Sequence, residues 1–519
     1  MADYTREEVE EKLAEYAEAL KAEKEATEAE EEEPAQEELE PAAEEEEQEP
    51  VDEEEGTGEI EEETVEEEDE EPSISFKGCD LSGLDLSDID FYGINMCEAN
   101  LEGANLARAD LKGVMLTKSN LKGADLNDAN LTEADLSEAN LNEAALKNAN
   151  LQEAVLKGAN LAQANLEQAN LRQSKFVEAN LNGANLSEAD FARADFSRTR
   201  LSGAKITGAE LSRSKFNGAD LSNADLTDSK LNMGVYFGTN FQGTILNRAQ
   251  MKGAKLSGAN FTDAQLPRAD LTSADLTEAR IHNSDLTRAK LNGAILRRTN
   301  LKDSDLSEAN LSIADLTGAS LANVKLTGAD LGRIKLNEAK LQGARLSGAN
   351  LSRAKLNKVE LAGADLSGGN LAGADFNEAN LEGSDLSRAT ITEATLEGVN
   401  LKNSFLAGAD IRNTHLAGAN LEGSDLAGAK LCKSNLSGVN LKGADLRRAD
   451  VEHADFSNAN LTGANFQGAK MADAIFKNSD LTEANLTETD TTDADFTGAT
   501  GFSPVKTVLK QYSSNRGNL

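Results

Sequence analysis

From Phe76 to Phe496, every fifth residue is a Leu, an aromatic residue or another apolar residue, with Thr491 as the sole polar exception. The span holds 85 consecutive five-residue units without a slip in register. A second series lies two residues earlier in each unit and is nearly always Ala or Ser. A strict short repeat of this kind predicts a solenoid, because each unit can bury its apolar side chains only by stacking on its neighbours.

The period of five excludes the ordinary elements. An amphipathic helix places apolar residues at steps of three and four, and a half-buried strand places them at steps of two. Two apolar side chains two residues apart point to the same side of an extended segment, so a bend must follow each pair. Gly recurs two residues after the Leu position, as at Gly103 and Gly203, and Pro267 directly follows Leu266. Both residue types are typical of turns, and we therefore expect one turn in every unit.

Units such as Ala104-Asn105-Leu106-Ala107-Arg108 follow one another without interruption. Tandem Ala-Asp/Asn-Leu-X-X units of this kind resemble the pentapeptide repeat family, and the resemblance covers 425 of the 519 residues. It implies an all-β fold, namely a right-handed quadrilateral parallel β-helix with four units in each turn. Residues 73–500 would then form a solenoid of about 21 coils, roughly 100 Å long at the usual strand spacing.

A coil of 20 residues predicts that residues 20 apart lie above one another. Aromatic residues follow this spacing, and so do long runs of Asn. Because stacked amides hydrogen-bond from coil to coil, we interpret the Asn runs as scaffold and not as a binding site. The aromatic runs are Phe176, Phe196, Phe216 and Tyr236, and Phe456, Phe476 and Phe496; the Asn runs start at Asn100 and Asn380 and end at Asn180 and Asn460.

Both ends of a solenoid need a cover, because an open coil exposes a β-edge. The first units carry bulky residues at the small-residue position, which would fill a core with no coil beneath it. In residues 501–519, Ser503-Pro504 is typical of a helix start, and we predict a short capping helix over residues 504–513. The resemblance also allows a homodimer through this end, but we favour the cap. The bulky residues are Ile74, Leu84, Ile89 and Ile94, and the helix would present Val505, Val508, Leu509 and Tyr512.

Residues 1–72 have a different composition, with 36 Asp and Glu against four basic residues. We expect residues 26–72 to be a disordered acidic tail, because like charge is dense and apolar groups are too few to offset chain entropy. Residues 1–25 have the pattern of a short amphipathic helix that begins with a capping box at Thr5 and Glu8. We interpret it as transient and solvated, because so short a helix nucleates poorly; partner docking or weak self-association is the alternative. Its apolar residues are Val9, Leu13, Tyr16 and Leu20.

Charge is segregated along the repeat. Residues 73–192 hold 9 basic and 18 acidic residues, residues 193–358 hold 25 and 16, and residues 359–499 hold 10 and 22. A polyanionic tail beside a positive middle favours contact between the two, within one molecule or between neighbours; random drift of a solvated surface is the alternative. We predict that the tail associates at low ionic strength with a basic region, and that salt releases it. The candidate interaction residues there are Arg193, Arg198, Arg200, Arg213 and Lys215.

No pattern of catalytic or metal-ligating residues is present. The three His are dispersed at outward positions, whereas a metal site needs converging ligands, and no two of the three Cys are placed for a disulfide. We expect no enzyme activity, cofactor, metal or small-molecule substrate. We find no signal-peptide pattern and no stretch of 18 apolar residues, and Trp is absent, so stacking platforms for nucleic acid are lacking. We therefore expect a cytoplasmic protein with no membrane association and no direct nucleic-acid binding.

Two classes of function remain. The first is a non-enzymatic scaffold, a stiff rod whose surface and tail bind other proteins. The second is a nucleic-acid mimic, because some members of the family that this chain resembles protect DNA gyrase by presenting an acidic rod of duplex-like size. A mimic needs its negative charge on the rod, and here residues 1–72 carry most of it. We favour the scaffold, since a fold alone does not determine a function.

Overall fold

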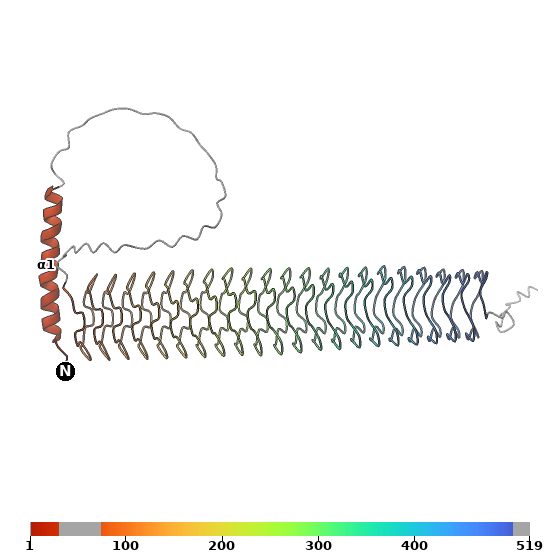
Figure 1. The fold of residues 1–519 in the computed structure, drawn as a ribbon, viewed down its shortest axis with the longest axis horizontal. Coiled ribbons are helices and arrows are strands. Elements are labelled where there is room, and N and C mark those ends of the chain that lie inside the picture. Colours follow the sequence, from red (N-terminus) through yellow and green to blue (C-terminus); the bar gives the residue numbers. More distant parts are fainter. Residues whose placement is uncertain (1, 31–73, 502–519) are drawn as a thin grey trace, which may run out of the picture.

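The computed structural model of the protein describes residues 2–30 and 74–501. One α-helix, α1 (Arg6–Glu30), precedes a long solenoid. Figure 1 shows α1 lying across the N-terminal end of the solenoid, whose coils continue in one straight stack to residue 501. The coils are held together by parallel bridges between residues 20 apart, from Ser75 with Asn95 to Asp480 with Thr500. The expected coil length of 20 residues is therefore confirmed.

Each coil has four sides, and each side is one five-residue unit. The residue before the Leu position forms the bridge, and the two residues after the Leu form a turn. In the unit around Leu101, for example, the N–H of Leu101 donates to Asn120 O in the next coil at 2.7 Å, and the N–H of Ala104 closes the turn on Leu101 O at 3.0 Å. Every side thus contributes very short β-structure, and the sides form four parallel ladders.

The second turn residue adopts a left-handed backbone throughout the solenoid. Gly103 and Gly203 have φ values of 65° and 67°, as expected for turn glycines. Many non-glycine residues take the same conformation, including Arg193 with a φ of 64°. The residue type at this position is therefore not restricted to Gly, and the position points outward. Charged side chains placed there reach solvent along the whole rod.

Where an Asp or Asn precedes the Leu position, its side chain commonly supports the turn that follows. Asp220 Oδ1 accepts the N–H of Ser222 at 3.0 Å, and Asp225 Oδ1 accepts both the N–H and the hydroxyl of Thr227, at 3.0 and 2.6 Å. These side chains satisfy a turn N–H, as Asx turns do. The preference for Asp and Asn in the repeat has this local cause.

The core is formed by the Leu series and the small-residue series. Leu226 and nearly all its counterparts are fully buried. Polar residues in the small-residue series bond to the backbone inside the core, as Ser119 Oγ does by donating to Leu116 O at 2.7 Å. Buried hydroxyl groups are thus satisfied, which avoids the cost of an unpaired polar group.

The predicted columns of aromatic residues and Asn are confirmed. The rings of Phe176 and Phe196 stack with centroids 4.6 Å apart, and those of Phe456 and Phe476 with centroids 5.0 Å apart. Side-chain amides form ladders, in which each Asn donates to the Asn 20 residues earlier. The distances from Asn120 to Asn100, Asn140 to Asn120, Asn160 to Asn140 and Asn180 to Asn160 are 3.0, 3.0, 3.1 and 2.9 Å.

The helix expected within residues 1–25 runs to Glu30, so residues 26–30 extend α1 instead of starting a disordered tail. It also packs on the first coil, whereas the sequence favoured a solvated helix. Val9 is fully buried, and the Tyr4 ring contacts the Phe76 ring edge-on with centroids 5.6 Å apart. Burial on the solenoid stabilises a helix that would nucleate poorly alone.

Candidate interaction surfaces

In the part of the chain that the structure describes, no catalytic group of side chains is assembled, and no cluster of His, Cys, Asp and Glu could hold a metal ion. His282, His415 and His453 lie in three different columns. All three Cys are free, and burial raises the pKa of Cys432 to about 11, so its thiol stays protonated and weakly nucleophilic. No helix among the described residues is both long and apolar enough to cross a membrane.

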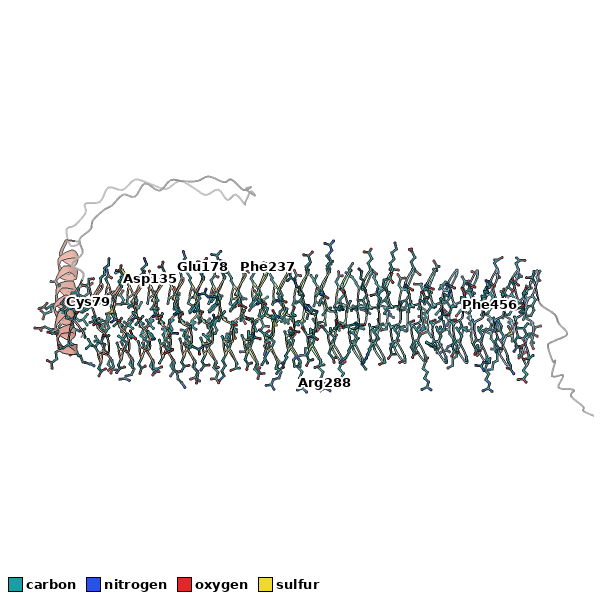
Figure 2. All side chains as sticks on the ribbon, turned by 60° about the horizontal axis from the view of Figure 1, so that its bottom comes forward. Cys79, Asp135, Glu178, Phe237, Arg288 and Phe456 are labelled. Atoms are coloured by element: carbon teal, nitrogen blue, oxygen red, sulfur yellow. The ribbon has the colours of Figure 1, made fainter. Side chains whose placement is uncertain are left out.

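Charged side chains project outward along the entire solenoid, as Arg288 does in Figure 2. We name two of the four sides by their columns of residues 20 apart. The basic side consists of the columns through Arg213, Lys215 and Asn217. The adjoining side consists of the columns through Arg198 and Arg200 and the column of Ser202.

The four-sided fold concentrates the positive charge of the middle third. Within residues 193–358, the basic side holds nine basic and three acidic residues, and the adjoining side holds seven and three. The two remaining sides together hold nine basic and ten acidic residues. The column through Arg213 has no acidic residue between Arg193 and Arg353. Positive charge is therefore a property of two adjacent sides and not of the whole middle third.

The five basic residues predicted as interaction candidates divide between these two sides. Arg193, Arg213 and Lys215 are exposed on the basic side, and we call them the near cluster. Arg198 and Arg200 are exposed around the corner on the adjoining side. Arg198 is already paired with Glu178 at 2.8 Å. The structure thus brings three of the five residues onto one surface.

A second basic group, which sequence reasoning missed, lies further along the basic side. Arg333, Lys335, Arg353 and Lys355 occupy two successive coils and are all exposed; we call them the far cluster. Lys335 and Lys355 are direct bridge partners, an arrangement of like charge that destabilises a sheet. Sorting the charged residues by steps of 20 would have revealed this group.

Only one member of the far cluster has an acidic partner among the described residues. Lys335 Nζ lies 3.7 Å from Asp315 Oδ2, which Arg297 also approaches at 2.8 Å. Burial raises the pKa of Asp315, but hydrogen bonds from Thr317 and Arg297 outweigh it and hold that pKa below its usual value. Asp315 is therefore a shared, ionised carboxylate, and the other three basic residues have no ion pair within the described chain.

Exposed apolar residues gather on the same side. Of the seven large hydrophobic residues that are exposed in the described part of the chain, five lie in the columns of the basic side. Four of these five lie between the near and far clusters, and they are between 38% and 62% exposed. An apolar stretch flanked by positive charge is the composition expected of a protein-binding surface. The five residues are Met115, Met233, Phe237, Ile295 and Ile313.

The end covered by α1 has a surface of its own. Asp3 N–H donates to Asp80 O and Asp80 N–H donates to Asp3 Oδ2, both at 2.6 Å. The Arg6 guanidinium donates to Asp85 O and Ser87 O at 3.2 and 3.0 Å. These contacts satisfy backbone groups on two sides of the open β-edge. The helix start is therefore a cap for the first coil.

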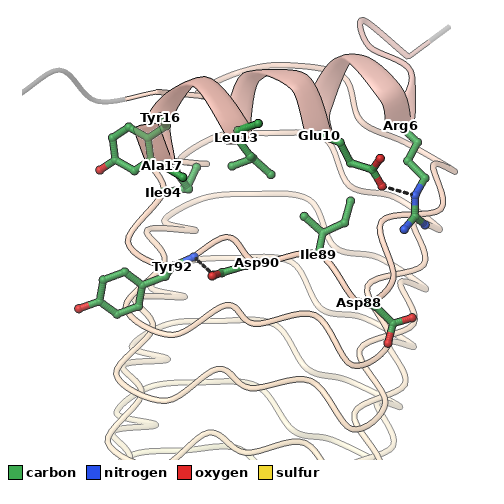
Figure 3. Close-up of a pocket in the computed structure, with 11 residues that line it drawn as sticks. Arg6, Glu10, Leu13, Tyr16, Ala17, Asp88, Ile89, Asp90, Tyr92 and Ile94 are labelled. Carbon is green, nitrogen blue, oxygen red and sulfur yellow. Dashed lines mark hydrogen bonds and ion pairs between the residues drawn. The ribbon is translucent and has the colours of Figure 1, made fainter. Parts of the chain in front are cut away.

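A cavity of about 430 Å³ remains between α1 and the part of the solenoid formed by residues 88–94. Figure 3 shows Leu13 and Ile89 on its opposing walls, with Arg6 and Glu10 at one end. Ile89 and Ile94 were expected to fill a core with nothing beneath it; instead, α1 covers them. The predicted cap residues at the other end, Val505, Val508, Leu509 and Tyr512, lie outside the described residues.

The geometry defines a four-sided parallel β-solenoid made of five-residue units. A family model described as pentapeptide repeats (8 copies) matches overlapping segments that together span residues 74–152 and 237–500. A second model, described as a pentapeptide repeat region, matches residues 149–226. The chain belongs to the pentapeptide repeat family, and its solenoid is accordingly a right-handed β-helix. Proteins of this family are generally non-enzymatic structural or interaction proteins.

Several solved structures are similar to this chain. HetL, a pentapeptide repeat protein involved in heterocyst differentiation regulation in the cyanobacterium Nostoc, is 31% identical over 45% of this chain and 89% of its own, with a TM-score of 0.19. QnrB1, a plasmid-mediated fluoroquinolone resistance protein, is 21% identical over 36% and 91%, with a TM-score of 0.22. Rfr23 of the cyanobacterium Cyanothece is 28% identical over 20% and 86%, with a TM-score of 0.15. No curated protein gave a match.

Proposed function

We propose that the protein is a non-enzymatic, cytoplasmic scaffold, a rod of about 21 coils that binds other proteins through its basic side. The observation that carries this proposal is the coincidence of two independent properties on one of four sides. That side holds most of the exposed large hydrophobic residues and the largest excess of basic over acidic residues in the middle third. Apolar contacts would supply affinity, and the flanking charges would set orientation and partner choice.

The rigidity of the surface supports this role. The exposed residues are mounted on coils that are held by backbone hydrogen bonds on both faces and by a continuous buried core. Side chains on such a support lose little backbone freedom on binding, which lowers the entropic cost of association. A partner that binds across several coils would contact a row of side chains at a spacing of ~4.8 Å.

Site-specific photo-crosslinking tests the proposal. A photoreactive amino acid at Ser257, on the basic side, is compared with one at Ser347, on the opposite side, in cells that make the full-length protein. We expect cross-linked partners from position 257 and few from position 347. Replacing Met233, Phe237, Ile295 and Ile313 by Ser should abolish the cross-links. Equal labelling from both positions would contradict the proposal.

A DNA-mimicking modulator of DNA gyrase is the alternative function. It would require an acidic rod surface, whereas two adjacent sides of the middle third are basic. A gyrase supercoiling assay with and without the full-length protein distinguishes the two. We expect supercoiling to be unchanged. A change in supercoiling that persists when the four basic residues of the far cluster are replaced by Glu would favour the mimic.

A further inference from the structure

The packing of α1 on the first coil determines where in space the two ends of the acidic segment 31–73 are attached. That segment has 25 acidic residues and no basic residue. On one side it follows α1, whose start is fastened to the first coil through Asp3, Arg6 and Val9. On the other side it leads directly into Ile74, where the first coil begins. Both ends are therefore held at the N-terminal end of the rod.

This double attachment limits how far the segment can extend along its own rod. Forty-three residues span at most roughly 145 Å when fully extended. Because the chain must leave and return to the same end, its furthest point lies at most roughly 70 Å away. Attachment at one end only would allow roughly twice this reach, about 145 Å.

The two basic clusters differ in their distance from that end. The near cluster lies six to seven coils from Ile74, or roughly 30 Å at the usual strand spacing. The far cluster lies 13 to 14 coils away, or roughly 65 Å. A molecule's own segment therefore has ample length to lie on its near cluster. The segment reaches the far cluster of its own rod only when its outgoing and returning halves are both fully extended. This leaves almost no residues to bind there and carries the largest entropic cost.

We propose that the far cluster binds the acidic segment 31–73 of a second copy of this chain. The inference rests on the proposed role of the basic side as a protein-binding surface, and it names a partner for that surface. The far cluster has one ion pair within the described chain and an unfavourable stack of Lys335 on Lys355. A polyanionic segment from another molecule would relieve this repulsion. Its attachment to its own rod does not prevent it from reaching the far cluster of a neighbour.

Sedimentation velocity of the full-length protein at low and moderate salt tests the proposal. We expect concentration-dependent self-association at ~20 mM salt that is lost at ~300 mM. The variant Arg333→Glu, Lys335→Glu, Arg353→Glu and Lys355→Glu should weaken association at least tenfold. The matched control carries the same four charge reversals on the two remaining sides, at Lys252, Arg268, Lys325 and Arg345, and should associate as the wild type does.

A mixing experiment separates a binding defect from a folding defect. A chain whose acidic residues in 31–73 are replaced by Gln lacks the ligand but keeps the far cluster, and the far-cluster variant has the opposite defect. Each should be monomeric alone, and the mixture should associate. Failure of the mixture, or equal loss in the matched control, overturns the proposal. Binding of a short DNA duplex by the wild type that is lost in the far-cluster variant would also overturn the proposal, because it would assign the cluster to nucleic acid.

The two proposals can fail separately. A protein that stays monomeric at all salt concentrations, but still gives cross-links from Ser257 to a different protein, refutes self-association and supports the scaffold. If the protein self-associates through the far cluster but gives no cross-link to another protein, the result supports the self-association and refutes binding to other proteins.

Discussion

The two ends of the solenoid are covered to different degrees within the described residues. In the first coil, Phe76, Leu81, Leu86 and Phe91 are all completely buried, because α1 lies over the open edge. In the last coil, Thr491, Ala494 and Phe496 are only partly buried. The repeat also differs between the ends, with Ile89 and Ile94 at small-residue positions near the start and Thr491 at a Leu position near the end. At the N-terminal end, a helix from outside the repeat therefore closes the first coil together with the bulky residues of the first units.

This difference implies a direction of unfolding. A solenoid is stabilised by each coil and by its contacts with its neighbours, so we expect the described coil with the less buried core to open first. With α1 in place, we expect the coils near residue 500 to open before those near residue 76.

A buried charge in mid-rod should give the largest effect. Leu226 is fully buried, so Leu226→Asp places an unpaired charge in the core at a cost of about 4 kcal/mol or more. The rod should open locally into two parts, and limited proteolysis with mass spectrometry should show that the part with α1 survives longer.

The matched control is Ser222→Asp, four residues away on an outward turn, which should leave the protease pattern unchanged. Equal damage from the two substitutions would show that the assignment of inward and outward positions is wrong. Faster loss of the part with α1 would reverse the proposed direction of unfolding.

Removal of the cap should have an intermediate effect. Val9→Asp replaces a fully buried side chain between α1 and the first coil, with an expected cost of about 2–3 kcal/mol. Hydrogen exchange should accelerate at least tenfold for amides of the first coil and remain unchanged in mid-rod. Glu11→Ala, on the exposed side of the helix, should have no such effect. Unchanged exchange in Val9→Asp would mean that α1 does not protect the first coil.

Acid should have the smallest effect, and it should act first on the last coil. The hydroxyl and the N–H of Thr497 bond to Asp495, and with Lys477 they lower the pKa of that carboxyl to about 2 from a usual value of 3.8. Because the folded-state pKa is depressed, this stabilisation is present above pH ~4 and is lost as pH falls toward 2. Hydrogen exchange in the last coil should therefore increase over that window.

The substitution Asp495→Asn provides the control for the acid prediction. Asn is common at this position of the repeat, and its carbonyl can accept the same turn N–H. The variant should lose the pH dependence of the last coil while keeping its structure near neutral pH. An unchanged pH dependence in Asp495→Asn would assign the effect to other carboxylates, such as Asp490, whose pKa is also lowered by Thr492.

Most of the solenoid could be predicted because its contacts follow from arithmetic. Once a coil of 20 residues is assumed, Phe196 must lie on Phe176 and Asn120 on Asn100, and both contacts are observed. The far cluster was missed for a different reason. Charge was summed along the chain in thirds, whereas Lys335 and Lys355 meet only when residues are sorted by column. The sequence contains this cluster, but it becomes visible only when residues 20 apart are compared.

The place of α1 could not be obtained in the same way. Thr5 and Glu8 predict a helix start, and the observed hydrogen bond from Thr5 N–H to Glu8 Oε2 at 2.6 Å agrees with it. Nothing in the local pattern indicates that the Tyr4 ring would pack against the Phe76 ring. That contact joins segments on either side of 43 residues that carry no repeat, so no periodicity relates them.

The period of five therefore identified the solenoid and the side chains inside it, and the coil length of 20 came from the resemblance to the pentapeptide repeat family together with the aromatic and Asn runs spaced by 20. Tertiary structure alone decided that α1 covers the first coil, whereas the clustering of positive charge and apolar residues on one side already follows from comparing residues 20 apart. The physical reason is the range of the interactions. Burial and clustering within the repeat are set by neighbours one coil away, whereas capping depends on where two segments with no common period come together in space.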